Sequence, residues 1–274
     1  GKAGTNNVFV ETRIGAISGT DDYLKYDRTS EAIFEPGLLN EYRVGMNGGT
    51  EVSTYNFSAS LYKDDSFNDI NEQIKRSLSF GYTRNVSEKL KYQASMSFVN
   101  FDSNLDYNAN TSFSRFSSFE GGGRGDLDTM DDATWATELE RSQNLAKTVD
   151  IRSRVNRFTA SNKFTYDVAK NLQANLTAGV DFRSSVQENN DTNEMQIYQE
   201  SIPAGTANRA SLDRSIRNNF TLTTDLNLTH RASISDFEFV TIVGAQFFRT
   251  ADRQNLLSGS GGVDGSTSVS YTHL

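Results

Sequence analysis

Apolar residues stand at every second position over long stretches of this chain. The clearest case is 172–182, where six apolar residues at even positions alternate with polar residues and one glycine. The stretches 90–98 and 220–229 show the same period. Because successive side chains of a β-strand point to opposite faces, this period predicts strands with one apolar and one polar face.

The alternating stretches are numerous and long. Six further stretches begin near Val8, Leu38, Val52, Gln73, Val155 and Phe237, so the sequence predicts about nine strands. Several approach a dozen residues, whereas strands of soluble proteins have about five or six and membrane-spanning strands need about nine to eleven. Length therefore favours strands that cross a membrane.

The connections between these strands alternate in length. The long ones cover 19–36, 63–72, 101–150 and 187–213, and the short ones lie at 47–49, 85–88, 169–171 and 232–235. Outer-membrane barrels have short periplasmic turns and long extracellular loops, which up-and-down connectivity makes alternate. We therefore predict an all-β fold: an antiparallel up-and-down transmembrane β-barrel, with about nine strands of an incomplete larger barrel.

Composition agrees with this fold class. The chain has 274 residues with 18 Phe, 11 Tyr and 20 Gly but only 2 Pro. Its mean hydropathy is −0.57, and no window approaches the roughly 18 consecutive apolar residues of a membrane helix. A polar average suits a barrel, because half of each strand faces water. Aromatic residues near strand ends are expected to form interfacial girdles, unless they only reflect a Phe-rich and Tyr-rich chain: Tyr62, Phe101, Tyr166, Phe182, Phe237 and Phe248.

Charge and motif content exclude several functions. The net charge is −8, without the clustered Lys and Arg that nucleic acid requires. The chain has no Cys, and its two His residues, His230 and His273, cannot assemble a zinc site. The glycines at 121–125 lack the Lys-Ser/Thr of a phosphate loop. We therefore predict no enzyme activity, no cofactor and no nucleic-acid partner.

Acidic residues follow the glycine cluster, at Asp126, Asp128, Asp131 and Asp132. A calcium loop that began at Asp126 would need Gly where Asp131 stands and Glu where Thr137 stands. We interpret the run as a solvated loop and predict no metal site, with an irregular calcium site as the less favoured alternative.

The segment 102–150 is the least strand-like and is predicted to be a long extracellular loop. Its part 131–146 has the pattern of an amphipathic helix. Its aromatic residues are weak candidates for ligand contacts, since sugars and peptides stack on exposed rings: Tyr107, Phe113, Phe116, Phe119 and Trp135. A loop that packs on itself is the alternative. On the polar face of the strands, Asp181 and Arg183 are either ligand contacts or ordinary wall residues.

Several stretches resemble the SusC/RagA group of TonB-linked outer-membrane receptors. The opening Gly1-Lys2-Ala3-Gly4 is similar to the segment that leaves the plug and enters the first barrel strand. The hairpin formed by 42–50 and 53–62 resembles the group's glycine turn and returning aromatic strand, and 74–80 with 88–91 resembles the next hairpin. The segments 156–160 and 179–182 resemble the same group more weakly. The resemblance covers about residues 1–250.

The resemblance implies a barrel of about 22 strands around a plug, located in the bacterial outer membrane and surrounded by its lipid. It implies uptake of an oligosaccharide or peptide, with a SusD-type surface lipoprotein as a lid and TonB as the energy source. Residues 1–250 would be part of that barrel, directly after a plug that lies outside this sequence, and 251–274 a loop or non-native tail. Two alternatives remain: a passive porin, and a soluble or surface-attached β-sheet adhesin or carbohydrate-binding protein that buries its apolar face on a second sheet.

Overall fold

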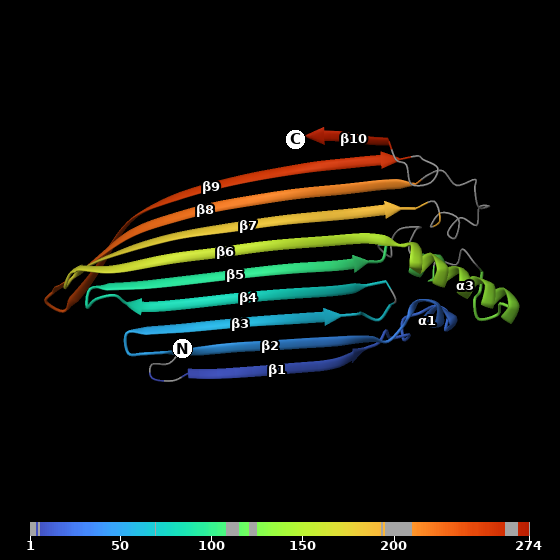
Figure 1. Ribbon diagram of the computed structural model, residues 1–274, viewed down its shortest axis with the longest axis horizontal. Helices are drawn as coiled ribbons and strands as arrows, with labels where there is room; N and C mark the ends of the chain where they lie inside the picture. The colour runs from blue at the N-terminus through green and yellow to red at the C-terminus, as the bar shows by residue number, and fades with distance from the viewer. Residues whose placement is uncertain are drawn as a thin grey trace.

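The computed structural model contains one antiparallel sheet whose strands follow each other in chain order (Figure 1). It describes residues 4, 6–68, 70–107, 115–120, 125–192, 194, 210–260 and 268–273, the last range by its backbone alone. The strands are β1 (Asn6–Ile17), β2 (Gly37–Gly49), β3 (Ser53–Asp64), β4 (Glu72–Asn85), β5 (Leu90–Leu105), β6 (Asp150–Ala169), β7 (Leu172–Asp191), β8 (Ser211–Ile234), β9 (Phe237–Ser260) and β10 (Ser268–His273). The predicted all-β up-and-down topology is confirmed, and the sheet is open, with β1 and β10 at its edges.

The end of the chain differs from the prediction of a loop or tail over 251–274. β9 continues to Ser260, and β10 pairs with its last residues, Asn255 to Ser260. Beyond Thr250 the sequence loses its alternation, because residues such as Asp252, Arg253 and Gln254 are polar on both faces. Backbone pairing with β8 continues all the same. A strand needs one apolar face only where that face meets an apolar environment, so the sequence pattern ended before the strand did.

The pairing register gives the sheet two contrasting faces. One row of directly opposed residues is apolar in all nine long strands: Val10, Val44, Ala59, Leu78, Phe98, Phe158, Phe182, Phe220 and Ala251. The next row, on the opposite face, is polar except for one valine: Glu11, Arg43, Ser60, Ser77, Val99, Arg157, Arg183, Asn219 and Asp252. We call these the apolar face and the polar face.

The band of large residues on the apolar face crosses the sheet obliquely. In β1 it comprises Val8, Val10 and Ile14. In β9 the band breaks off at Phe247, four positions before Ala251, which shares the row of Val10, and only the isolated Leu257 follows on this face. Barrel strands are tilted by about 35–45°, so a band that is level in a membrane must shift along successive strands. The register therefore fits tilted strands of a barrel.

The aromatic residues divide between both faces. Tyr62 and Phe101 lie opposite Lys75, in a row that reaches Ser185 of the polar face. Phe248 lies opposite Thr223 and is also on the polar face, so the expectation that these three rings belong to a girdle on the lipid-facing side was wrong. Three aromatic rings of β4, β5 and β6 instead cluster on the apolar face near the tight turns. The centroid of the Tyr92 ring lies 4.9 Å from that of Phe164 and 6.4 Å from that of Tyr82.

Tight turns and long connections occupy opposite ends of the strands (Figure 1). The turns after β2, β4, β6 and β8 lie at one end, and α1 (Arg28–Ile33) and α3 (Asp132–Thr148) lie at the other, as the alternating connection lengths predicted. A third helix, α2 (Arg115–Glu120), belongs to the same long connection as α3. No helix among the described residues is long and apolar enough to cross a membrane.

The buried core lies in these long connections. Tyr26, Ala32 and Ile33 of the β1–β2 connection pack against Phe119, Leu127 and Trp135 of the β5–β6 connection. The helix predicted over 131–146 is confirmed as α3, which begins at its N-cap Asp131. The Asp131 carboxylate accepts hydrogen bonds from the Thr134 backbone N–H at 3.0 Å and its hydroxyl at 2.7 Å, as N-cap residues commonly do. Two connections far apart in sequence thus form one compact cap.

Candidate functional site

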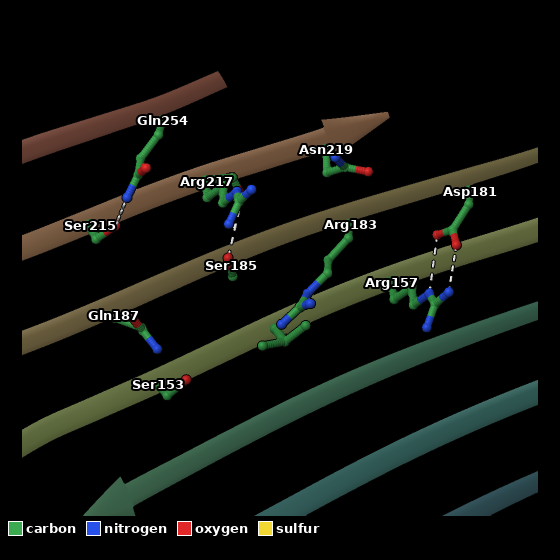
Figure 2. Close-up of a pocket in the computed structure, with 11 residues that line it drawn as sticks. Ser153, Arg157, Asp181, Arg183, Ser185, Gln187, Ser215, Arg217, Asn219 and Gln254 are labelled. Atoms are coloured by element: carbon green, nitrogen blue, oxygen red, sulfur yellow. Dashed lines mark hydrogen bonds and ion pairs between the residues drawn. The ribbon is translucent and has the colours of Figure 1, made fainter. Parts of the chain in front are cut away.

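The polar face carries a pocket over β6 to β9 (Figure 2). Its volume is about 500 Å³, and side chains from four neighbouring strands line it, with charged groups at Arg157, Asp181, Arg183 and Arg217. Serine, asparagine and glutamine side chains fill the positions between the charges. The pocket exists because every second residue of four adjacent strands points to the same face.

Arg157 and Asp181 form a two-pronged ion pair between β6 and β7. The Nε and Nη2 atoms of Arg157 donate to the two carboxylate oxygens of Asp181 at 3.1 and 2.5 Å. The partner of Asp181 in the register is Thr159, so Arg157 reaches diagonally to make this contact. Fork-to-fork pairing of this kind fixes both side chains in one orientation.

A second arginine pair closes the other side of the pocket. Arg217 of β8 donates through Nε to both oxygens of Asp252 on β9, at 3.1 and 3.0 Å, and through Nη2 to one of them. Beside it, the Gln254 side-chain amide donates to the Ser215 hydroxyl at 3.2 Å. These contacts hold the Arg217 side chain against the wall.

Arg183 stands between the two pairs. It lies directly opposite Arg157 on one side and Asn219 on the other. Its guanidinium is exposed and makes no ion pair with any residue that the structure describes; Figure 2 draws no contact to it. Three guanidinium groups and the Asp181 carboxylate line the pocket, and Asp252 pairs with Arg217 from beside it. The five groups together carry one excess positive charge, in a chain whose net charge is −8.

The aromatic candidates of the long loop have different positions. Phe119 and Trp135 are buried against each other, with ring centroids 6.1 Å apart in an edge-to-face arrangement. The Trp135 indole N–H donates to Glu31 at 3.1 Å. This placement matches the alternative of a self-packed loop. Phe116 packs against the same cluster, and Phe113 lies outside the described residues.

Tyr107 and Phe116 line a second, smaller pocket of about 340 Å³ between the long connections. The Tyr107 hydroxyl donates a hydrogen bond to Asp191 at the end of β7. Burial, and after it this hydrogen bond, raises the pKa of the Tyr107 phenol well above its ordinary value. Ligand contact by Tyr107, Phe113, Phe116, Phe119 and Trp135 stays a prediction.

The acidic run of the loop holds the cap together. Asp128 accepts hydrogen bonds from the backbone N–H groups of Asp27 and Arg28, at 3.3 and 3.2 Å. The Arg28 guanidinium forms an ion pair with Asp132 at 3.0 Å. Within the described ranges, no three His, Cys, Asp or Glu side chains are grouped as metal ligands would be.

Sequence reasoning singled out Asp181 and Arg183 but missed Arg157, Arg217 and Asp252. All five occupy the same face, and the period of two places each of them there within its own strand. The position of Arg157 beside Asp181 depends on the β6–β7 register, and that of Arg217 beside Asp252 on the β8–β9 register. The two pairs come together through the β7–β8 register, across a connection that spans 192–210 and has no local pattern that fixes it.

Comparison with known proteins shows a likeness of fold. No protein-family model matches the sequence, and no curated protein matches it. Solved structures titled "RagAB peptide importer" match in the closed-closed state with TM-score 0.64 and 14% identity, and in the open-open state with TM-score 0.66 and 14% identity. A structure titled "RagAB peptide transporter" matches with TM-score 0.65 and 13% identity.

These matches cover 91–93% of this chain but only 30–31% of the matched chains. Sequence identity at this level shows shared architecture alone. The chain therefore has the fold of about a third of a RagAB importer chain.

Proposed function

We propose that this protein is an outer-membrane nutrient transporter of the SusC/RagA kind, energised through TonB, in which this chain forms part of the barrel wall. The observation that carries the proposal is the register: one apolar row and one polar row run without interruption across nine strands, apart from Val99. The likeness to the RagAB structures supports it. In this proposal the protein binds and translocates a ligand and catalyses no reaction.

Exposure of the apolar face supports a lipid environment. Val10 is 77% exposed, Ile14 71% and Phe237 70%. A soluble protein rarely leaves an apolar surface of this extent in water, whereas barrel strands present such side chains to lipid. An adhesin or carbohydrate-binding sandwich would cover this face with a second sheet, and the described residues form a single sheet.

A peptide suits the polar face better than a neutral glycan. Peptides carry charged ends and charged side chains, which complement a wall that holds both guanidinium and carboxylate groups. Neutral sugars depend more on exposed aromatic rings, and none of the described side chains that line the pocket over β6 to β9 is aromatic. A SusD-type lipoprotein would sit over the end that carries α1 and α3, and TonB would act from the end of the tight turns.

Uptake in cells tests this function. The full-length protein is expressed in a bacterial host, and accumulation of fluorescent oligopeptides and of fluorescent oligosaccharides is measured with and without TonB. The proposal predicts heat-modifiable protein in the outer-membrane fraction and TonB-dependent accumulation of peptide. Protein that fractionates as soluble contradicts the barrel, and uptake that is independent of TonB indicates a passive porin.

A further inference from the structure

Arg183 is placed where electrostatics disfavours it. Its directly opposed neighbour on β6 is Arg157, and like charges at opposed positions of antiparallel strands destabilise a sheet. Asp181 is the nearest carboxylate along the same strand and face, yet both of its oxygens are bound by Arg157. The charge of Arg183 is therefore not balanced by the described part of the wall.

The surroundings of Arg183 are fixed. Arg157 is held by Asp181 on one side, and Arg217 is held by Asp252 on the other. Between them, Asn219 lies opposite Arg183, and Ser185 lies two residues further along the same face. The Arg183 side chain extends away from Asn219, toward the strand that carries Ser153 and Arg157 (Figure 2). A ligand group that reached its guanidinium would thus meet a wall that also offers hydroxyl groups such as that of Ser153, without any need for the neighbouring arginines to move.

We infer that Arg183 binds a carboxylate group of the transported ligand on the polar face over β6 to β9. This inference rests on the proposed transport function and adds the chemistry that the wall recognises. A planar guanidinium donates two parallel hydrogen bonds to a carboxylate, which gives both affinity and orientation. The excess positive charge of the pocket attracts an anion, although the chain as a whole has a net charge of −8.

The carboxylate has two possible sources, the C-terminus of a peptide and an acidic sugar. Binding to the purified full-length protein in detergent distinguishes them, by fluorescence anisotropy with two matched pairs of probes. The first pair is a labelled peptide with a free C-terminus and the same peptide amidated. The second pair is a labelled uronate oligosaccharide and its neutral counterpart.

The wild-type protein is expected to bind the acid of one pair about tenfold or more tightly than its neutral partner, since a hydrogen bond to a charged group contributes about 1.5–3 kcal/mol and 1.4 kcal/mol is tenfold. Arg183→Gln should abolish the difference by weakening the acid alone. Arg183→Lys should keep part of the difference in affinity, because the positive charge remains while the two parallel N–H donors of the guanidinium are lost. Arg43→Gln is the matched control: it shares the register row of Arg183 but lies on β2.

An unchanged preference for the acid in Arg183→Gln overturns the inference and leaves the transport function intact. The same holds if the wild type binds acid and neutral probes equally. If wild-type cells show no TonB-dependent uptake of any probe, the proposed transport function itself is contradicted, whatever the binding data for Arg183 show. Heat-modifiable migration checks that each variant is folded, and removal of one member of a like-charge pair is not expected to unfold the sheet.

Discussion

The hydroxyl of Tyr107, two residues after β5, donates a hydrogen bond to the carboxylate of Asp191, the last residue of β7. The contact passes over β6, which lies between these two strands. It joins the beginning of the long β5–β6 connection to the rim of the sheet. Asp191 also accepts a hydrogen bond from the Ser211 hydroxyl at 3.1 Å, so the same carboxylate connects the start of β8.

Tyr107→Phe is expected to loosen the cap. The substitution keeps the ring and removes a hydrogen bond to a charged group, which contributes about 1.5–3 kcal/mol. Hydrogen exchange should show faster opening of 102–150, while β7 exchanges as before. Tyr23→Phe is the control, because Tyr23 is exposed in the β1–β2 connection; equal exchange in both variants would contradict the role of the Tyr107 contact.

The Tyr107 contact should weaken in alkali. The phenol's pKa is raised in the folded protein, chiefly by burial and then by Asp191, so the folded state holds this proton more tightly than the unfolded state does. Its contribution to stability is complete below the ordinary tyrosine pKa of about 10 and is lost as pH rises above it. The difference in proteolysis rate between wild type and Tyr107→Phe should be constant from about pH 7 to 9 and shrink above about pH 10. A constant difference across the whole range would argue against this.

Gly37→Ala should destabilise the contact between the start of β2 and the β3–β4 connection. A Cβ atom at Gly37 would lie 1.5 Å from the backbone oxygen of Ser66, which has a positive φ of 55°. Relief of such overlap by movement of the backbone costs about 1–3 kcal/mol or more. Gly15→Ala on β1 is the matched control, since its Cβ would meet only the Leu39 side chain, at 3.9 Å. The thermal midpoint of heat-modifiable migration measures both, and an equal midpoint for the two variants would refute the close approach.

Trp135→Ala should destabilise the cap without disturbing the sheet. The indole is 7% exposed and contacts Phe119, and large-to-small changes at buried aromatic residues cost about 3–5 kcal/mol. Limited proteolysis should cut within 115–148 far faster, while the β6–β9 hairpins stay resistant. Glu140→Ala on the exposed side of α3 should behave as wild type. Resistance of the Trp135 variant would mean that the cap does not depend on this cluster.

The sequence predicted those strands and helices whose residues follow a regular pattern over a short stretch of chain. The period of two in 172–182 defined β7 and its faces, and Asp131 before an amphipathic stretch marked the start of α3. The cap was not predictable, because it joins Tyr26 and Ile33 to Trp135 across about a hundred residues of chain.

For a similar reason, the sequence predicted only some of the residues of the charged pocket. Asp181 and Arg183 lie in one continuous pattern, whereas Arg157, Arg217 and Asp252 join them through register. A shift of one residue in any hairpin would move such side chains to the other face. The same limit misplaced Tyr62 and Phe101, whose face follows from pairing with Lys75 rather than from proximity to a strand end.

The proposed barrel wall requires above all that the apolar face of β7 meets lipid and its polar face meets water. This sequence has no cysteine, so single cysteines at each position of 174–183 can carry a spin label once any cysteine elsewhere in the full-length protein is replaced by serine. In the full-length protein in lipid vesicles, the account predicts high accessibility to oxygen at Leu176, Ala178 and Val180 and to an aqueous nickel reagent at Asn175, Thr177 and Asp181. Accessibility without this period of two, or aqueous contact at every position, would contradict it.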